Sequence, residues 1–474
     1  MHTGLLRLFC LSVLLWLSAA HAELPEAVNK ALQAEGVPPG SVSVFVQQLD
    51  QHQPVINHHA DQALNPASTM KLLTTYAGLD LLGPAYRWRT EAYYDGSLRD
   101  GVLKGNLILK GYGDPALMTE DFWRLLSSLR QAGVKDIRGD LVLDTSYFAA
   151  ESTNPGAFDN EPYRAYNAMP SALLVNLKST SFRLEPGMQG GGAAVRVLPE
   201  PDLPEMKIIN HLKLVQSGCG DWKNRLDYAI KPQGHITMVT FSGTYAADCG
   251  EKYLELSVFD DAAYTFNLFR KLWQQLGGSL QGTVRQAATP VNAVKLAEQS
   301  SMSLADVIRR INKYSNNLMA RQLLLTIAAE REGVPATEVG GDKAIRAWLA
   351  SKGWNFPELV IENGAGLSRI ERISAKHLGE LLMDAYFSPV MPELMSSLPV
   401  LSVDGTVGHR LKDSPAQGRA HLKTGSLDGV RSIAGYVLDQ KGRRWVVVFM
   451  ANHPRAGATR NAQDALLDWV YQHE

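Results

Sequence analysis

The sequence lacks the patterns that identify several common classes of enzyme and binding protein. It contains no Cys-x-x-Cys pair and no His-Glu-x-x-His motif, so neither a redox pair nor a zinc site is indicated, and we expect no metal or other cofactor. No Gly-x-Ser-x-Gly elbow is present, which argues against the catalytic triad of an α/β-hydrolase. The formal net charge is only −1 and no long basic stretch occurs, so we expect no nucleic-acid partner.

Long apolar runs are absent except at the N-terminus. Residues 1–22 combine Arg7, an apolar run from Leu8 to Leu17 and an Ala20-His21-Ala22 ending, which is the pattern of a secretory signal peptide. The run is too short to span a bilayer, and a buried N-terminal helix is the alternative interpretation. We therefore expect an exported, periplasmic protein without a transmembrane anchor, and peripheral association with a membrane stays open.

Cysteine is scarce, with three residues in 474. Removal of the leader would remove Cys10 and leave Cys219 and Cys249. An even pair in an exported chain suggests a disulfide, which would stabilise the fold by roughly 3–4 kcal/mol by restricting the unfolded chain. Two buried free thiols are the alternative.

Three short motifs are present and follow one another along the chain. They are Ser68-Thr69-Met70-Lys71, Ser315-Asn316-Asn317 and Lys423-Thr424-Gly425. A serine hydroxyl is a weak nucleophile until a base takes its proton, and a lysine can be that base when burial or a nearby cation lowers its pKa. Ser68 and Lys71 lie three positions apart on a predicted helix that begins near Asn65, so their side chains share one face.

The second and third motifs supply groups that can handle a peptide substrate. Between two predicted helices, Ser315 could pass a proton to a leaving nitrogen and Asn317 could hold a backbone amide. On a predicted strand, Lys423 offers positive charge and Thr424 offers a donor for a carboxylate. The structural alternatives are a turn between helices and an exposed strand lysine. Together, in this order, the motifs indicate an acyl-transfer enzyme that attacks a peptide or lactam carbonyl.

The distribution of predicted helices and strands favours an α+β fold. A strand at 42–48 and a helix from about Asn65 to Gly83 precede a long stretch of short strands and turns. Three antiparallel strands and a final helix are expected at the end of the chain: 421–426, 430–438, 444–450 and 459–472. The 247 positions between Ser68 and Ser315 exceed what a compact active site needs. We therefore expect one catalytic domain built from both chain ends, with further domains inserted between them.

With these motifs, the sequence resembles the D-alanyl-D-alanine carboxypeptidases/endopeptidases of the penicillin-binding protein 4 type, the class C low-molecular-mass penicillin-binding proteins. The resemblance covers nearly the whole chain after residue 22 and includes five more segments: Lys110–Pro115, Tyr166–Leu173, Cys219–Trp222, Asp248–Gly250 and Asn363–Arg369. It implies a penicilloyl-serine transferase (β-lactamase/transpeptidase-like) catalytic domain with two nested, β-rich inserted domains. The expected division is a signal peptide at 1–22, the catalytic domain at 23–87 and 292–474, inserted domain II at 88–188 and 261–291, and inserted domain III at 189–260.

The resemblance also implies a role for each motif residue: acylated nucleophile for Ser68, base for Lys71, proton relay for Ser315, amide binding for Asn317, and carboxylate binding for Lys423 and Thr424. The backbone amides of Ser68 and Ser426 would form an oxyanion hole. The substrates would be peptidoglycan stem peptides and cross-links, and β-lactams would be covalent inhibitors.

Some positions depart from the family pattern, and some acidic positions lie near the place expected for the substrate's side chain. Tyr112 stands where the family often has glycine, and Asn363 and Ala365 lie in a loop that often reads Asp-Gly-Ser-Gly. Four acidic residues are candidates for contact with the substrate's side chain: Asp159, Glu161, Glu362 and Asp428. A solvated loop is the alternative for each of them.

Two other functions stay open on the sequence. A β-lactamase would share the three motifs, although hydrolysis of a lactam needs no such insertion, and rapid turnover of penicillin would favour it. A non-catalytic wall-binding or sensor homologue would keep the fold, although the intact motifs argue against it.

Overall fold

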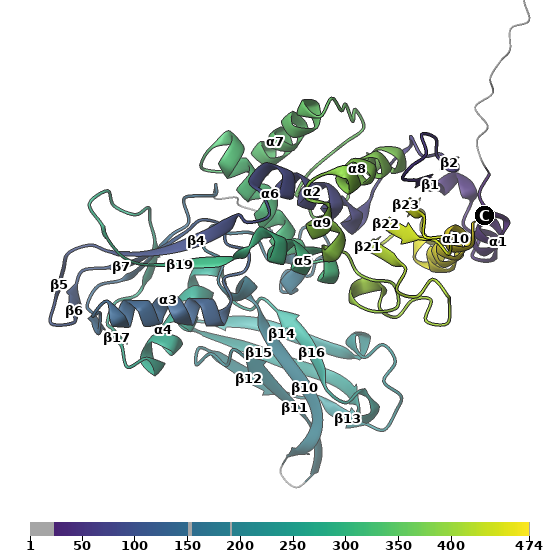
Figure 1. Ribbon diagram of the computed structural model, residues 1–474. Helices are drawn as coiled ribbons and strands as arrows, with labels where there is room; N and C mark the ends of the chain where they lie inside the picture. The colour runs from purple at the N-terminus through teal and green to yellow at the C-terminus, as the bar shows by residue number, and fades with distance from the viewer. Residues whose placement is uncertain (1–22, 150–153, 190–191, 474) are drawn as a thin grey trace, which may run out of the picture.

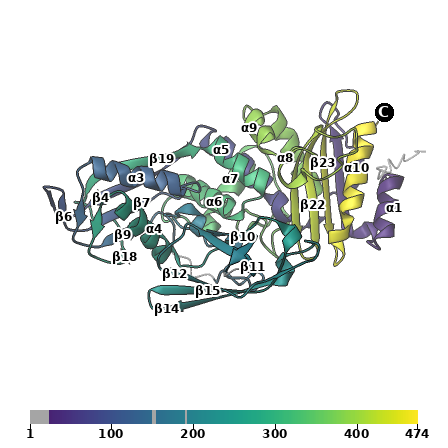
Figure 2. The same cartoon turned by 90° about the horizontal axis from the view of Figure 1, so that it is seen from below.

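The computed structural model describes residues 23–149, 154–189 and 192–473 (Figure 1). The predicted signal peptide at 1–22 lies outside the described residues. Near the two ends of the described chain, α1 (Glu26–Ala34) packs against α10 (Arg460–Gln472). Figure 2 shows α10 on one face of an antiparallel sheet and α8 (Ala375–Phe387) on the other. The first and last parts of the chain therefore build one layered α/β unit.

The sheet of this unit has the order β2-β1-β23-β22-β21, and all its pairings are antiparallel. The strands are β2 (Ile56–His58), β1 (Val42–Gln48), β23 (Arg444–Asn452), β22 (Val430–Leu438) and β21 (Ala420–Leu427). The two middle strands, β22 and β23, are buried over most of their length because helices cover both faces of the sheet. The predicted strand at 42–48, the C-terminal strands and the final helix are confirmed.

A helical layer lies beside this sheet, around α2 (Lys71–Leu82). This helix is buried from Lys71 to Leu79 and packs against α5 (Leu304–Tyr314), α6 (Asn317–Glu332) and α7 (Glu338–Ser351). The predicted helix was expected to run on from about Asn65, and that start is wrong. Ala67 has a φ of 46°, which an α-helix cannot contain, so a 3-10 turn, η2 (Ala67–Met70), comes before α2.

Between α2 and α5 the chain forms mainly β structure. One sheet has the order β18-β9-β7-β4-β19 and contacts the helices α3 (Thr119–Gln131) and α4 (Asp261–Gln275). Its strands are β18 (Val284–Gln286), β9 (Leu141–Asp144), β7 (Leu107–Gly111), β4 (Arg87–Tyr94) and β19 (Val294–Ser303). Because β19 pairs with β4, the chain stays in this sheet until α5 begins. The division of the chain into domains stays a prediction.

Further strands of this region form smaller sheets: β10 to β16 lie below the first sheet, and β5, β6 and β17 lie at its left end in Figure 1. They are β5 (Ser97–Arg99), β6 (Val102–Lys104), β8 (Asp136–Ile137), β17 (Ser279–Leu280), β10 (Thr180–Gln189), β11 (Gly192–Glu200), β16 (Lys252–Leu256), β12 (Met206–Asn210), β13 (Lys213–Val215), β14 (Leu226–Gln233) and β15 (Ile236–Ala246). The predicted disulfide is confirmed: Cys219 and Cys249 are bonded, with their Cα atoms 4.6 Å apart. Across the described ranges, no helix has the length and apolar character needed to cross a membrane.

Candidate active site

Ser68 lies in the η2 turn, where the chain passes from the sheet to α2. The left-handed residue before it, Ala67, is held by Asn65, whose Oδ1 accepts the Ala67 N–H at 2.8 Å. Asn65 is itself held by Asn452 of β23. The Asn65 N–H donates to Asn452 Oδ1 at 2.8 Å, and Asn452 Nδ2 donates to the Asn65 carbonyl oxygen at 3.0 Å. Side-chain hydrogen bonds thus tie the turn that presents Ser68 to the last strand of the sheet.

Lys71 is fully buried and faces Ser68. Its Nζ lies 3.0 Å from Ser68 Oγ and 2.7 Å from Asn317 Oδ1, and it also contacts the carbonyl oxygen of Ala365. Burial and the positive charge of Lys423 hold the pKa of Lys71 well below its usual value, and Glu371 opposes this shift. The arrangement can leave Lys71 neutral and within reach of the serine proton.

Ser315 and Lys423 form a second contact in the same site. Ser315 ends α5 in a left-handed conformation, with a φ of 56°, and its Oγ accepts a hydrogen bond of 2.9 Å from Lys423 Nζ. Lys423 Nζ also donates to the Thr424 carbonyl oxygen at 2.7 Å. Lys423 is fully buried, and burial lowers its pKa to about 7. The turn that follows Ser315 starts α6, which places Asn317 against Lys71.

The outer part of strand β21 carries the remaining predicted residues. The Thr424 hydroxyl donates to Thr406 Oγ1 at 2.7 Å, and Ser426 Oγ accepts a 3.0 Å bond from Arg431. Gly425 lets β21 approach η2, because a Cβ there would lie 2.8 Å from the Ser68 nitrogen. The structure therefore brings the seven predicted catalytic and substrate-binding residues into one site between the sheet and the helical layer: Ser68, Lys71, Ser315, Asn317, Lys423, Thr424 and Ser426.

Glu371 is a residue of this site that sequence reasoning missed. It is fully buried, and its Oε1 accepts the N–H groups of three consecutive residues at 2.8–3.1 Å: Glu362, Asn363 and Gly364. Burial raises the pKa of Glu371, while these N–H groups and Lys71 lower it. The carboxyl fixes the loop whose Ala365 carbonyl contacts Lys71. No short-range sequence pattern marks Glu371, because Lys71 and the loop that carries Ala365 come together only in the folded protein.

Gly366, in the same loop, gives a sharp prediction about the position of Ser68. Its φ is 77°, and a Cβ there would lie 1.9 Å from the Ala67 oxygen and 2.7 Å from the Ser68 nitrogen. Gly366→Ala should displace the η2 turn and lower the penicillin acylation rate at least 100-fold, on the order expected when reacting atoms are misplaced by about 1 Å. Stopped-flow or gel-based labelling measures this rate.

Gly353 provides the matched control for Gly366. It has the same φ of 77°, but no atom lies within 4 Å of a Cβ built on it. Gly353→Ala therefore carries the same backbone strain without the collision, and its acylation rate should stay near that of the wild type. Equal rates for the two variants would contradict a steric role of Gly366.

Asp159 and Glu161, two of the acidic candidates, make hydrogen bonds within the region between α2 and α5. Asp159 accepts from Tyr166 at 2.8 Å and from Asn167 at 2.7 Å. Glu161 Oε2 accepts from Tyr228 at 2.8 Å. Neither carboxylate has a contact with a motif residue among the described interactions, and both stabilise the local fold around η3 (Ala165–Asn167).

Glu362 and Asp428, the other two candidates, lie near Arg369. Glu362 and Arg369 line one cavity of about 250 Å³ together with Phe158, and the Arg369 guanidinium stacks on the Phe158 ring at 4.5 Å. The fully exposed Asp428 carboxylate lies 3.7 Å from Arg369. Arg369, which sequence reasoning did not single out, thus contacts both Asp428 and Phe158 and shares a cavity with Glu362. Within the described ranges, no group of three or more acidic, histidine or cysteine side chains is placed to hold a metal ion.

Comparisons with known proteins identify the family to which this chain belongs. Residues 24–473 match the profile of the D-Ala-D-Ala carboxypeptidase 3 (S13) family. The chain is 27% identical to the D-alanyl-D-alanine carboxypeptidase DacB of Haemophilus influenzae, over 90% of this chain and 88% of that protein. It is 28% identical to the D-alanyl-D-alanine carboxypeptidase of Actinomadura sp. (strain R39), over 94% of this chain and 84% of that protein.

The fold is also similar to a solved structure over nearly its whole length. The crystal structure of penicillin binding protein 4 (dacB) from Haemophilus influenzae superposes with a TM-score of 0.77 and 25% identity, over 94% of this chain and 99% of that one. The family profile spans both chain ends and everything between them, including all three motifs. The chain therefore belongs to the D-Ala-D-Ala carboxypeptidase 3 (S13) family of serine peptidases.

Proposed function

We propose that the protein is a serine DD-peptidase that hydrolyses D-Ala-D-Ala termini and D-Ala-linked cross-bridges of peptidoglycan through an acyl-serine intermediate. The observation that carries this proposal is the 3.0 Å contact between Ser68 Oγ and a fully buried Lys71 whose pKa is lowered. Membership of the S13 family supports the choice of substrate.

In the acylation step, neutral Lys71 takes the proton of Ser68 while Oγ attacks the carbonyl carbon of the penultimate D-alanine. The backbone amides of Ser68 and Ser426 stabilise the negative charge that develops on the carbonyl oxygen. When the tetrahedral intermediate collapses, the C–N bond breaks, and the proton passes through Ser315 to the departing nitrogen. Water then attacks the acyl-serine, with Lys71 again acting as the base.

Substrate binding is assigned to the groups around this centre. Asn317 binds the substrate's backbone amide, and Lys423 and Thr424 hold the carboxylate of the departing residue. We also propose that Arg369 and the nearby Glu362 and Asp428 contact the side chain of the stem peptide, since Arg369 and Glu362 line one cavity and Asp428 lies 3.7 Å from Arg369.

The pKa of Lys423 predicts how binding depends on pH. At a pKa of about 7, Lys423 carries its charge below pH 7 and loses it as the pH rises. Because kcat/KM reports ionisations of the free enzyme, kcat/KM for a substrate that ends in a carboxylate should fall above pH 7. A substrate that ends in a carboxamide should not show this fall. The same pH dependence for both substrates would contradict the assignment.

The proposed function is tested with purified protein and isolated muropeptides. Mass spectrometry should show loss of one alanine from monomeric pentapeptides and conversion of cross-linked dimers into monomers, and the ratio of these products gives the balance of the two activities. A penicillin should form a long-lived adduct. Rapid penicillin turnover would favour a β-lactamase, and no product from any muropeptide would favour a non-catalytic wall-binding homologue. The substrate lies outside the cytoplasm, so we also propose that the chain is exported.

A further inference from the structure

A second cavity, of about 220 Å³, begins at the motif strand β21. Its lining residues come from the loop after α9 (Met391–Ser397), from β21 and β22, and from α10: Thr406, His409, Arg410, Thr424, Arg431, Ser432, Arg460 and Gln463. The hydroxyls of Thr424 and Thr406, bonded to each other at 2.7 Å, belong to the same cavity as the guanidinium groups. The cavity is therefore continuous with the place assigned to the substrate's carboxylate.

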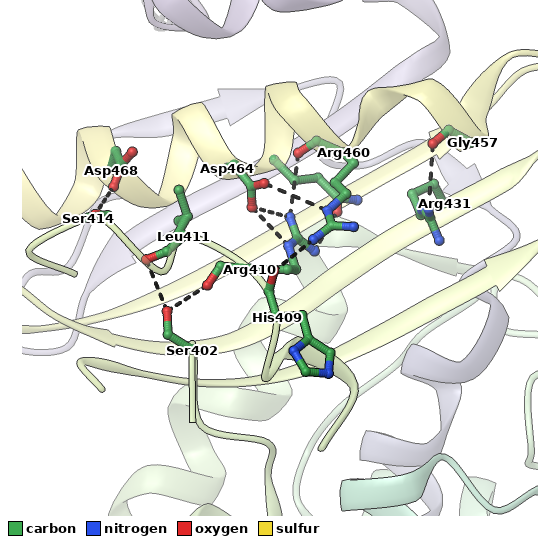
Figure 3. Close-up of polar contacts among 11 residues, drawn as sticks. Ser402, His409, Arg410, Leu411, Ser414, Arg431, Gly457, Arg460, Asp464 and Asp468 are labelled. Atoms are coloured by element: carbon green, nitrogen blue, oxygen red, sulfur yellow. Dashed lines mark hydrogen bonds and ion pairs between the residues drawn. The ribbon is translucent and has the colours of Figure 1, made fainter. Parts of the chain in front are cut away.

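The cavity holds more positive than negative charge. Asp464 neutralises Arg410, with contacts of 2.6 and 2.8 Å, and lies 3.9 Å from Arg460. Arg431 instead donates to two uncharged groups, Ser426 Oγ at 3.0 Å and the Gly457 carbonyl at 3.5 Å. Figure 3 shows Arg431 apart from Asp464. In the part of the chain that the structure describes, no carboxylate lies within 4.0 Å of the Arg431 nitrogens, so this cation lacks a counter-ion.

Two further features favour an anion in this cavity. Gln463 is fully buried, its Oε1 accepts from Arg410 at 3.1 Å, and its Nε2 has no acceptor among the described residues. A buried donor without an acceptor is unfavourable unless a ligand or water fills the position. In addition, α10 begins at Arg460, and a helix N-terminus adds positive potential to a cavity in which Arg431 already lacks a counter-ion. A bound anion would accept from Gln463 Nε2 and balance the positive charge of Arg431 and of the α10 N-terminus.

We propose that this cavity binds the carboxylate of the departing residue and that Arg431 is the cationic contact there. The inference rests on the proposed DD-peptidase function, because that reaction supplies a leaving residue with a free carboxylate. Arg431 bonds Ser426, whose backbone amide belongs to the proposed oxyanion hole, and the cavity opens at Thr424. The buried Lys423 of β21 and the half-buried Arg431 of the neighbouring strand β22 would both supply positive charge to the carboxylate.

The test compares two peptides that differ only in the charge of the departing residue, one ending in D-Ala-D-Ala carboxylate and one in its carboxamide. Arg431→Gln should lower kcat/KM for the carboxylate peptide about 10- to 100-fold, the range for a hydrogen bond to a charged group, mainly through KM. The carboxamide peptide should change by less than about twofold if this charge is the only interaction lost. Arg431→Lys, which keeps the charge, should restore much of the loss.

Arg419 provides the matched control, since it is an exposed arginine immediately before β21. Arg419→Gln should leave both rates unchanged. Acylation by benzylpenicillin and by its methyl ester gives a second carboxylate comparison that needs no peptide turnover, and Arg431→Gln should slow only the free acid. Thermal unfolding of each variant checks that it is folded.

The outcomes separate this inference from the proposed function. If the wild type cleaves both peptides and Arg431→Gln slows them equally or not at all, the inference is wrong and the proposed function stands. A wild type that cleaves neither peptide overturns both. Stabilisation of the wild type by inorganic phosphate, lost in Arg431→Gln without any change in the carboxylate-to-carboxamide ratio, would assign the cavity to a free anion and also overturn the inference.

Discussion

Ser68→Ala is expected to abolish covalent labelling by a fluorescent penicillin and to slow D-alanine release by about 10⁴- to 10⁶-fold. Ser68 Oγ is the atom assigned to form the acyl bond. Among the groups that contact Lys71 Nζ in the described chain, it is the only hydroxyl. Gel fluorescence and intact-protein mass measure the adduct, and peptide mapping of the labelled wild type should place it on Ser68.

A control separates this loss from a loss of folding. Ser97 is an exposed serine on strand β5 and lies outside the three motifs, so Ser97→Ala should be labelled like the wild type. Ser68→Ala should unfold at nearly the wild-type temperature, because Lys71 retains its contacts with Asn317 and Ala365. Labelling that survives in folded Ser68→Ala would rule out Ser68 as the nucleophile.

Lys71→Met is expected to have the second largest effect, a fall of about 10²- to 10⁴-fold in the penicillin acylation rate, as for loss of a general base. Methionine fills similar space but cannot accept the proton of Ser68. Lys376, an exposed lysine paired with Asp61 at 3.0 Å, provides the control, and Lys376→Met should be acylated normally. Acylation of Lys71→Met at the wild-type rate would move the base to another group.

The same variant tests the lowered pKa of Lys71 through stability. Between the folded pKa and the usual value of 10.5, the unfolded chain holds one proton more than the folded chain at this site. The contribution of Lys71 to the free energy of unfolding therefore rises with pH across that window, by about 1.4 kcal/mol per pH unit. In urea unfolding, the free energy of unfolding of Lys71→Met relative to that of the wild type should be highest at low pH. Parallel plots of this free energy against pH for the two proteins would contradict the lowered pKa.

Local sequence patterns predicted the elements that carry the motifs. Two apolar-rich segments separated by a Lys441-Gly442 turn marked strands β22 and β23, and the helix around Lys71 followed from its apolar residues and the Gly83 stop. The start of that helix was wrong because Ala67 adopts a left-handed conformation that only contacts with distant residues explain. Asn452, 387 positions from Asn65, holds that conformation in place, and no window of the sequence contains both.

The surroundings of the motifs were harder to predict for the same reason. Glu371 acts on Lys71 through a loop 294 positions from the lysine along the chain, so its role depends on tertiary packing. Asp159 accepts hydrogen bonds from Tyr166 and Asn167, and the presence of an acidic residue in the sequence does not reveal such partners. The sequence did not distinguish Arg431 from other strand arginines. Its lack of a counter-ion depends on which groups surround it once β22 packs against α10.

The pairing of Asn65 with Asn452 also has a consequence for how the protein is made. Synthesis delivers the N-terminal end first, so Asn65 and the turn that follows it emerge 387 positions before Asn452, the residue that orders this turn. A chain that stops before β23 lacks both asparagine contacts and the sheet beneath them. Premature termination should therefore yield fragments without a formed nucleophile, because the turn that presents Ser68 is ordered only when the last strand of the sheet is in place.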